Sequence, residues 1–466
     1  MKQLKYLLPI LLAFSISMVS AQNNKGKLDK KTINEIRNSF KNTPQNTAAI
    51  NAVTHNSIKT LAKSRANEGK QNHFINTKVT THGISNQHSS GRCWLYTGLN
   101  TLKPMVLEKY DIEGFEFSQT YNFFWDQFEK SNLFLEIAIA TADKPLTDRK
   151  VQWMMKNPIG DGGQWTTFAD IVKKYGVVPA SAMPDTYQSK NTRMMSRLLA
   201  RKLREDAMEL RDLANNGAKH KNLASTKIEM LKDIYRMLAL SLGEPPQQFI
   251  WQYETKAGSA SKVYTYTPEK FYQEVVGINV DDYVMFMNDP SRDYYKLYEV
   301  EYDRNLAEGA NWKYINLPID VIKKFAVKSI KGNEAMYFSC DVGKQLDGKA
   351  GYLDVNLYDY NDLFGVEFGM NKAKRIQTFD SGSSHGMALI GANVLDDGTT
   401  DKWLLENSWG ADKGDHGYLT MTDAWFDNYM FRLVINKKYI DADVLKILNS
   451  KATLLPPWDP MFAPEE

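Results

Sequence analysis

The chain has 466 residues, of which 43% are hydrophobic and 12% aromatic, and its formal net charge is +3. This length and composition are typical of a globular protein with a sizeable core, and they exclude an intrinsically disordered chain. Because Lys and Arg are interspersed with Asp and Glu, nothing indicates an electrostatic nucleic-acid binder, and we expect no nucleic-acid partner.

Residues 1–21 have the pattern of a secretory signal peptide. A basic start (Met1–Lys5) precedes a mostly apolar stretch (Tyr6–Phe14), and small residues at Val19 and Ala21 predict cleavage after Ala21. The apolar stretch is short for a membrane span and no later stretch is suitable, so no membrane anchor is expected. The sequence therefore predicts an exported protein, either periplasmic or secreted.

A polar, lysine-rich segment follows the predicted cleavage site. Residues 22–72 contain few aromatic residues, which predicts an N-terminal segment that lies on the surface. Residues 73–190 then combine helical patterns with Gly-rich loops, and we expect them to form a helical lobe.

The first strong helical pattern begins at one of the chain's two cysteines. In SNQHSSGRCWLYTGLN (Ser85–Asn100), Gly91 ends a loop of small polar residues. Apolar residues then recur with the spacing of one helical face: Leu95, Leu99, Leu102 and Val106. Cys93 is therefore predicted in the first helical turn, where backbone N–H groups and the helix dipole favour the reactive thiolate. Pro104 predicts a bend or break in this helix.

A second helix and a glycine-rich loop follow. Ser118 is a cap signal ahead of an aromatic, mostly buried helix within Phe115–Asn132. GDGGQW (Gly160–Trp165) is rich in glycine but lacks the spacing and the Lys of a phosphate-binding loop.

Residues 191–276 are predicted to be an inserted helical subdomain. Two charged helical patterns indicate a helical hairpin. The apolar positions of the first pattern are Met195, Leu199, Leu203, Ala207 and Leu210. Thr226 and Glu229 have the spacing of a capping box, which predicts the start of the second helix, and Gly243 predicts its end.

From residue 277 the pattern changes to strands. Six segments favour strands: YKLYEVEYD, AMYFSCDV, GMALIGANV, KWLLENSWG, GYLTMT and MFRLVIN. Residues 277–446 are therefore predicted to form a β-rich lobe. Residues 447–466 contain closely spaced prolines, which predict an extended C-terminal arm.

A reactive thiol needs a base and a group that orients the base. His385 lies where a Gly/Ser loop enters an apolar strand, and Asn407 ends the next strand, so adjacent strands would bring them together. The Gln87 amide and the Cys93 backbone N–H could stabilise an oxyanion. Cys340 follows an apolar run and is interpreted as a buried structural residue.

These residues lie in segments that resemble the three catalytic blocks of the papain superfamily: NQHSSGRCWLY, SSHGMALIGANV and LLENSWGADKGDHGYLTM. The resemblance is closer to the bleomycin hydrolase/aminopeptidase C branch. That branch is indicated by SSGRCWL, FEFSQTYNFFWDQFEKSN, GDGGQW, GVVPASAMPDTY, GEPPQQF, CDVGK and LPPWDPM. Together these segments run from about residue 80 to residue 463.

The resemblance implies an α+β, papain-like two-lobed cysteine peptidase fold with a helical insertion. The site would lie in the cleft between the two lobes, where Cys93 attacks a peptide carbonyl and Gln87 helps to bind the oxyanion. His385 would protonate the leaving amine, Asn407 would orient His385, and Trp409 would shield that hydrogen bond. No metal or cofactor is implied.

The resemblance also implies how peptide substrates bind. Gly162, Gly163 and Trp165 would lie along the substrate cleft, and the carboxylate of Glu466 would pair with the substrate's free α-amine. This arrangement predicts an aminopeptidase that removes N-terminal residues, and the helical insertion would build a homohexamer.

Three positions depart from the family pattern, and two other functions stay open. Gly386 replaces the usual alanine, His88 replaces a common lysine, and the tail from Phe462 to Glu466 differs in sequence. If the tail does not occupy the cleft, the chain could be a papain-like endopeptidase. A disulfide between Cys93 and Cys340 would instead favour a catalytically silent peptide-binding protein.

Overall fold

The computed structural model describes residues 26–462. The predicted signal peptide and Glu466 lie outside these residues. The described chain divides into two compact units, one comprising residues up to 63 with 360–366, and the other residues 64–359 with 367 onward.

The smaller unit is helical. It contains α1 (Lys30–Ser39), α2 (Pro44–His55), α3 (Ile58–Ala62) and α14 (Tyr360–Phe364). α14 packs against α3, whereas α1 buries none of its residues. The Asp29 and Thr43 side chains cap the first two helices by accepting hydrogen bonds from backbone N–H groups.

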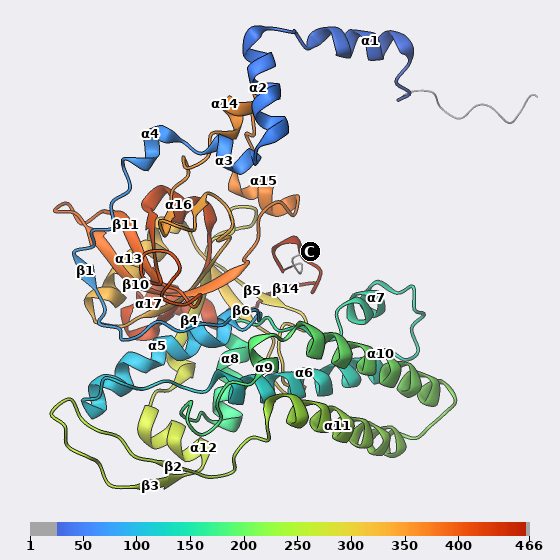
Figure 1. The fold of residues 1–466 in the computed structure, drawn as a ribbon. Helices are drawn as coiled ribbons and strands as arrows, with labels where there is room; N and C mark the ends of the chain where they lie inside the picture. Colours follow the sequence, from blue (N-terminus) through green and yellow to red (C-terminus); the bar gives the residue numbers. More distant parts are fainter. Residues whose placement is uncertain (1–25, 463–466) are drawn as a thin grey trace, which may run out of the picture. The chain divides into compact units, whose positions relative to one another are not determined.

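Helices form one layer of the larger unit (Figure 1). They are α5 (Cys93–Tyr110), α6 (Gln119–Ala140), α7 (Arg149–Lys156), α8 (Trp165–Tyr175), α9 (Tyr187–Lys190), α10 (Arg193–Asn215) and α11 (His220–Leu242). The predicted apolar face of α5 is confirmed, because all four of its residues are buried. Ser118 caps α6 as predicted by accepting a hydrogen bond from the Tyr121 N–H.

Of the bend or break predicted at Pro104, a break does not occur in α5. The helix continues to Tyr110, and Leu102 and Val106 on either side of the proline are both buried. Burial of both halves in one core offsets the backbone hydrogen bond that proline cannot donate.

α10 and α11 form the predicted hairpin and pack against each other and against α6. The predicted apolar positions of α10 are all buried. The capping-box prediction at Thr226 is wrong, because α11 begins at His220. Leu223, one turn before Thr226, is already buried in the core, so packing extends the helix beyond the local cap signal.

A twelve-stranded mixed sheet forms the second layer. Its order is β14-β5-β6-β4-β13-β7-β10-β11-β12-β9-β8, with β1 also paired to β10. The strands are β1 (Thr77–Lys78), β4 (Tyr283–Met287), β5 (Lys296–Val300), β6 (Lys313–Asn316), β7 (Met336–Cys340), β8 (Leu346–Asp347), β9 (Tyr352–Leu353), β10 (His385–Val394), β11 (Thr400–Glu406), β12 (Tyr418–Thr422), β13 (Met430–Asn436) and β14 (Thr453–Leu455). All six predicted strand segments contain a strand, and the predicted α+β class is confirmed.

Smaller elements connect or cover these layers. They are α4 (Arg65–Glu68), the hairpin β2 (Phe249–Trp251) and β3 (Tyr264–Tyr266), α12 (Pro268–Lys270), α13 (Ile319–Lys331), α15 (Lys372–Gln377), α16 (Asp423–Tyr429) and α17 (Ala442–Leu445).

The sheet separates two hydrophobic cores because side chains alternate along each strand. On β7, Tyr337 belongs to the core shared with the helical layer, whereas Met336 and Phe338 belong to the core under α13. α5 packs on β7 and β10 from the first side. This packing brings the N-terminal end of α5 to the start of β10.

The C-terminal arm is extended only in part. β14 pairs in parallel with β5, and a 3₁₀ turn then occupies Pro460–Phe462. The Phe462 ring packs edge-on against Trp312 with ring centroids 4.8 Å apart. Asp459 accepts a hydrogen bond from Arg292, so side-chain contacts override the extended conformation that the prolines favour.

Glu406 makes the stability of the fold depend on pH. Burial raises its pKa to about 7, although Lys103 and Thr81 oppose this shift. Between about pH 4.5 and pH 7 the folded chain therefore keeps a proton that the unfolded chain loses, so stability falls as pH rises. We expect Glu406→Gln to remove a slope of up to about 1.4 kcal/mol per pH unit. Urea unfolding of both proteins at pH 5, 6 and 7 measures this, and parallel stability curves would contradict it.

Candidate active site

Cys93 is the first residue of α5, as predicted, and its side chain is partly exposed. Cys340 ends β7 and is fully buried, and burial raises the pKa of its thiol well above the usual value. No disulfide joins these two cysteines, which are the only ones in the chain and both lie in the described part. The buried position of Cys340 agrees with the structural role predicted for it.

His385 and Asn407 come together at the ends of neighbouring strands. His385 begins β10, Asn407 directly follows β11, and His385 Nε2 lies 2.8 Å from Asn407 Oδ1. The backbone N–H of Ser408 donates to the same Asn407 atom over 2.8 Å, which identifies that atom as the amide oxygen. Because an oxygen accepts, Nε2 of His385 must carry a hydrogen, and in the neutral imidazole Nδ1 is then the basic nitrogen.

The Trp409 ring covers this pair. It stacks on the His385 imidazole with ring centroids 4.8 Å apart and an interplanar angle of 27°. His385 and Asn407 are both buried, so the hydrogen bond between them lies in a region of low solvent access.

Hydrogen bonds connect the loop before Cys93 to the loop after Asn407. The Gln87 N–H donates to the Ser408 carbonyl over 2.8 Å, and the Ser408 hydroxyl donates to Gln87 Oε1 over 2.7 Å. The Gly410 N–H donates to the Ser85 carbonyl over 3.1 Å. Gln87 Nε2 donates one hydrogen to the Ser90 carbonyl, which leaves its second hydrogen for another acceptor.

The packing of α5 on β10 places Cys93 beside the start of that strand. The Thr97 hydroxyl, one turn after Cys93, donates to the Cys93 carbonyl over 2.8 Å. A Cβ added at Gly386 would lie only 3.1 Å from that hydroxyl and 3.3 Å from the Tyr337 hydroxyl. The glycine that replaces the family's usual alanine therefore allows close approach of helix and strand next to His385.

The glycine-rich loop packs directly on the helix of Cys93. Trp94 Nε1 donates to the Asp161 carbonyl over 2.7 Å, and a Cβ at Gly163 would lie 2.7 Å from the Trp94 ring. Lys130 of α6 donates to the carbonyls of Gly160 and Gly162 and forms a 2.7 Å ion pair with buried Asp126. This partly buried cation holds the backbone of the loop in place.

Trp165 and Glu466 were also predicted to bind substrate. Trp165 begins α8 with its side chain only 4% exposed, and it packs against Tyr283 and Tyr337 in the core. Glu466 lies outside the described residues.

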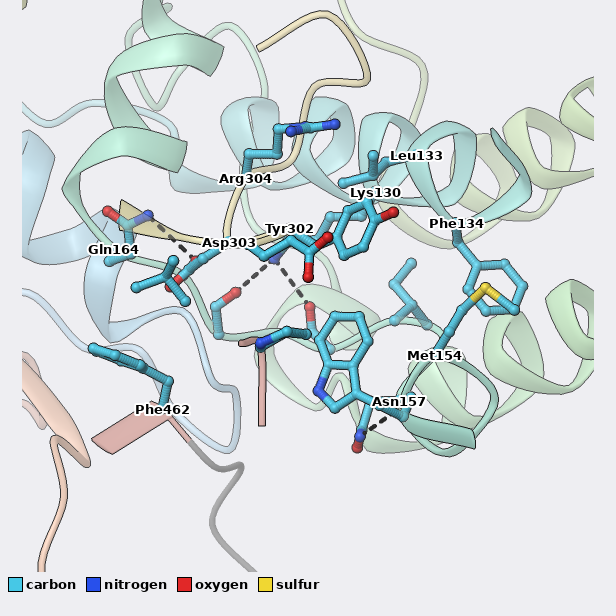
Figure 2. Close-up of a pocket in the computed structure, with 18 of the residues that line it drawn as sticks. Lys130, Leu133, Phe134, Met154, Asn157, Gln164, Tyr302, Asp303, Arg304 and Phe462 are labelled. Carbon is cyan, nitrogen blue, oxygen red and sulfur yellow. Dashed lines mark hydrogen bonds between the residues drawn. The ribbon is translucent and has the colours of Figure 1, made fainter. Parts of the chain in front are cut away.

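A cavity of about 390 Å³ lies beside this site (Figure 2). One part is apolar, and Figure 2 shows Leu133, Phe134 and Met154 from the helical layer there. The rest of the lining comes from the glycine-rich loop, the C-terminal arm and polar side chains of other segments, including Gly162, Gly163, Gln164, Asp303, Ser383, Arg432 and Phe462. The cavity therefore reaches from the α6–α7 region to Ser383, two residues before His385.

Sequence patterns did not single out several of these residues. Lys130 lies in a helix among other charges, and Arg432 lies within an apolar strand segment. Their roles depend on partners that are distant in the sequence, so no local sequence pattern could identify these two residues. Ser408 could have been noticed, because it directly follows Asn407.

Neither a metal site nor a membrane span is found in residues 26–462. Nowhere in that range do three or more His, Cys, Asp or Glu side chains gather as a metal site would require. No helix there combines the length and apolar character needed to cross a bilayer.

Known proteins resemble this chain over nearly its whole length. Residues 27–462 match the family described as Peptidase C1-like family. Mouse bleomycin hydrolase is 40% identical over 452 residues, covering 95% of this chain and 99% of the relative. Aminopeptidase C of Streptococcus thermophilus is 38% identical, covering 89% and 94%, respectively.

The crystal structure of PepW from Lactobacillus rhamnosis HN001 superposes on this fold with a TM-score of 0.90. It is 38% identical in sequence, and the match covers 94% of this chain and 99% of PepW. The papain-like α+β fold expected from the sequence is confirmed. The chain belongs to the Peptidase C1-like family, in the branch that contains bleomycin hydrolase and aminopeptidase C.

Proposed function

We propose that this cysteine peptidase is an aminopeptidase that removes N-terminal residues from peptides by means of Cys93, His385 and Asn407. The observation that carries the proposal is the His385 Nε2–Asn407 Oδ1 contact of 2.8 Å beside the helix that begins at Cys93. Relatives named bleomycin hydrolase and aminopeptidase C support the same activity.

The proposed reaction has two stages. The Cys93 thiol transfers its proton to His385 Nδ1, and the sulfur attacks the peptide carbonyl carbon to form a tetrahedral intermediate. His385 then gives the proton to the leaving amine, the C–N bond breaks and a thioester remains. In the second stage His385 takes a proton from water, the hydroxide attacks the thioester, and the carboxylic acid and the thiol are released.

Other residues lower the barrier without exchanging a proton. The second Nε2 hydrogen of Gln87 and the Cys93 backbone N–H would donate to the oxyanion. Asn407 holds His385 in the tautomer that leaves Nδ1 basic, and Trp409 shields that hydrogen bond from water. The carbonyl and N–H groups of Gly162 and Gly163 would pair with the peptide backbone in the cleft.

The C-terminal arm is proposed to limit cleavage to the N-terminus of the substrate. Pro457, Met461 and Phe462 line the cavity next to the glycine-rich loop, which supports this role. The last residues, including Glu465 and Glu466, carry carboxylates that could pair with the α-amine of a peptide. An endopeptidase remains the alternative, since an arm that leaves the cleft open would permit internal cleavage.

We also propose that the mature chain is exported and forms a hexamer. The signal-peptide pattern of residues 1–21 supports export into the periplasm or out of the cell. Several large apolar side chains are exposed on the α10–α11 hairpin: Met194, Leu198, Ile228 and Leu240. Such residues are typical of contact surfaces between subunits.

Cys93 should be the reactive thiol. Cys93→Ser should abolish peptide hydrolysis, and iodoacetamide should modify Cys93 much faster than buried Cys340. Cys340→Ala is the matched control, since it removes the other thiol and should keep activity and labelling rate. Mass spectrometry after timed labelling measures both thiols. Equal labelling rates or an active serine variant would contradict the assignment.

The arm should impose a requirement for a free amine. Removing residues 463–466 keeps Phe462 on Trp312 and removes only the end of the arm. The full-length enzyme should strongly prefer a free-amine peptide over its N-acetylated twin, whereas the truncated enzyme should cleave both internally. Chromatography of the products distinguishes the patterns. If the full-length enzyme cleaves both peptides equally well, the protein is an endopeptidase and not an aminopeptidase.

The mature protein should scatter light as a particle of about six times its chain mass. Leu240→Glu should shift this mass downward, because it places a charge on an exposed apolar surface. Lys221→Glu, on the same helix but already at a polar position, serves as the control. A monomer at micromolar concentration would refute the hexamer.

A further inference from the structure

A bulge in β13 places Arg432 on the face of the sheet that packs against α5. In this antiparallel pair Met430 lies opposite Cys340, and Arg432 lies opposite the adjacent residue, Ser339. Phe431 therefore has no residue opposite it and is the extra residue of the bulge. Ser339 in turn pairs with Gly386 on β10. Arg432 and Gly386 therefore occupy one row across three strands, roughly 10 Å apart, with side chains on the same face. Bulges of this kind commonly aim a side chain into a site.

No carboxylate contacts Arg432 among the described residues, although the charge of Asp303 acts on it from a longer distance and opposes the lowering of its pKa by burial. Among residues 26–462, no acceptor lies within hydrogen-bond distance of its buried Nε, and no carboxylate forms an ion pair with it. Its guanidinium lies over the Trp312 ring at 4.4 Å, which holds the group in place and leaves its donor edge unused. The buried Nε would gain a hydrogen-bond acceptor from a ligand that carries one.

The other charges of the cavity have partners of different kinds, and Arg304 also keeps a buried Nε without an acceptor among the described residues. Lys130 pairs with Asp126 at 2.7 Å, and Glu301 accepts from Lys150 at 2.6 Å. Arg304 donates to Asn311 over 2.6 Å. Gln164 donates to Asp303 over 3.4 Å, and burial raises the pKa of that carboxyl, a shift that the charge of Arg432 opposes.

We propose that Arg432 determines specificity by binding the side-chain carboxylate of an acidic residue near the N-terminus of a peptide substrate. The guanidinium offers a planar fork of donors, and two parallel hydrogen bonds to a carboxylate match that geometry. In the cavity lining Arg432 lies 6.0 Å from the Phe462 ring of the arm, and it pairs with Ser339, whose hydroxyl accepts a hydrogen bond from Ser383. This inference rests on the proposed peptidase function.

The chain's own end is the competing occupant. Glu465 and Glu466 follow Phe462 closely, and their carboxylates have the same chemistry as an acidic substrate side chain. A test must therefore distinguish a carboxylate of the peptide from one of the arm.

The test compares two free-amine peptides that differ only by Glu or Gln at one of the first two positions. Arg432→Gln should lower kcat/KM for the Glu peptide by about tenfold or more and leave the Gln peptide within about twofold. Arg432→Lys keeps the positive charge but cannot form two parallel hydrogen bonds to a carboxylate. It should give a ratio of kcat/KM values, Glu peptide over Gln peptide, between those of the wild type and Arg432→Gln. Arg304→Gln removes another cation of the same cavity and should change the Glu/Gln ratio much less.

Binding of the same peptides to Cys93→Ser, with and without Arg432→Gln, separates this inference from the peptidase proposal. Calorimetry should show tighter binding of the Glu peptide only when Arg432 is present, even if hydrolysis fails. The inference is overturned if Arg432→Gln changes neither the ratio of binding affinities nor the ratio of kcat/KM values for the Glu and Gln peptides. A preference for Glu that appears only after residues 463–466 are removed assigns Arg432 to the chain's own end, and also overturns it.

Discussion

The active site depends on the hydrogen bonds that join two loops distant in the sequence. Gln87 and Ser408 exchange a backbone and a side-chain hydrogen bond, and the Gly410–Ser85 bond lies beside them. These bonds position the loop that ends at Cys93 relative to the strand end that carries Asn407. The tautomer of His385 then follows, because the Ser408 N–H identifies the Asn407 atom that faces the ring as an oxygen.

A buried ion pair has a comparable role on the substrate side. Lys130 contacts Asp126 and also donates to two carbonyls of the glycine-rich loop. Burial raises the pKa of Asp126, but the neighbouring ammonium and hydrogen bonds from Asn305 and Gln127 oppose the shift. A charge pair in such a position contributes little to the free energy of folding. Its main effect is to hold the loop in one conformation. That loop borders the cavity where a peptide would lie.

The two sides of the cavity differ in chemistry, which has consequences for selectivity. Aromatic and aliphatic side chains of α6 and α7 can accept an apolar group, whereas Arg432 offers hydrogen-bond donors in another part of the lining. Phe462 of the C-terminal arm lies beside Arg432, with its ring centroid 6.0 Å from the guanidinium. The arm therefore contacts the side of the cavity where Arg432 is proposed to bind substrate.

The sequence by itself determined the α+β class, the helix of Cys93, the six main strands and the residues expected to act together. It could do so because helical and strand periodicity is local, and because the three blocks around Cys93, His385 and Asn407 resemble a known family. The tertiary structure alone decided where Pro104 is tolerated, where α11 begins and how the arm turns, since core packing outweighs local signals there. It alone also decided the positions of Lys130 and Arg432, because the role of a buried charge depends on which distant groups surround it.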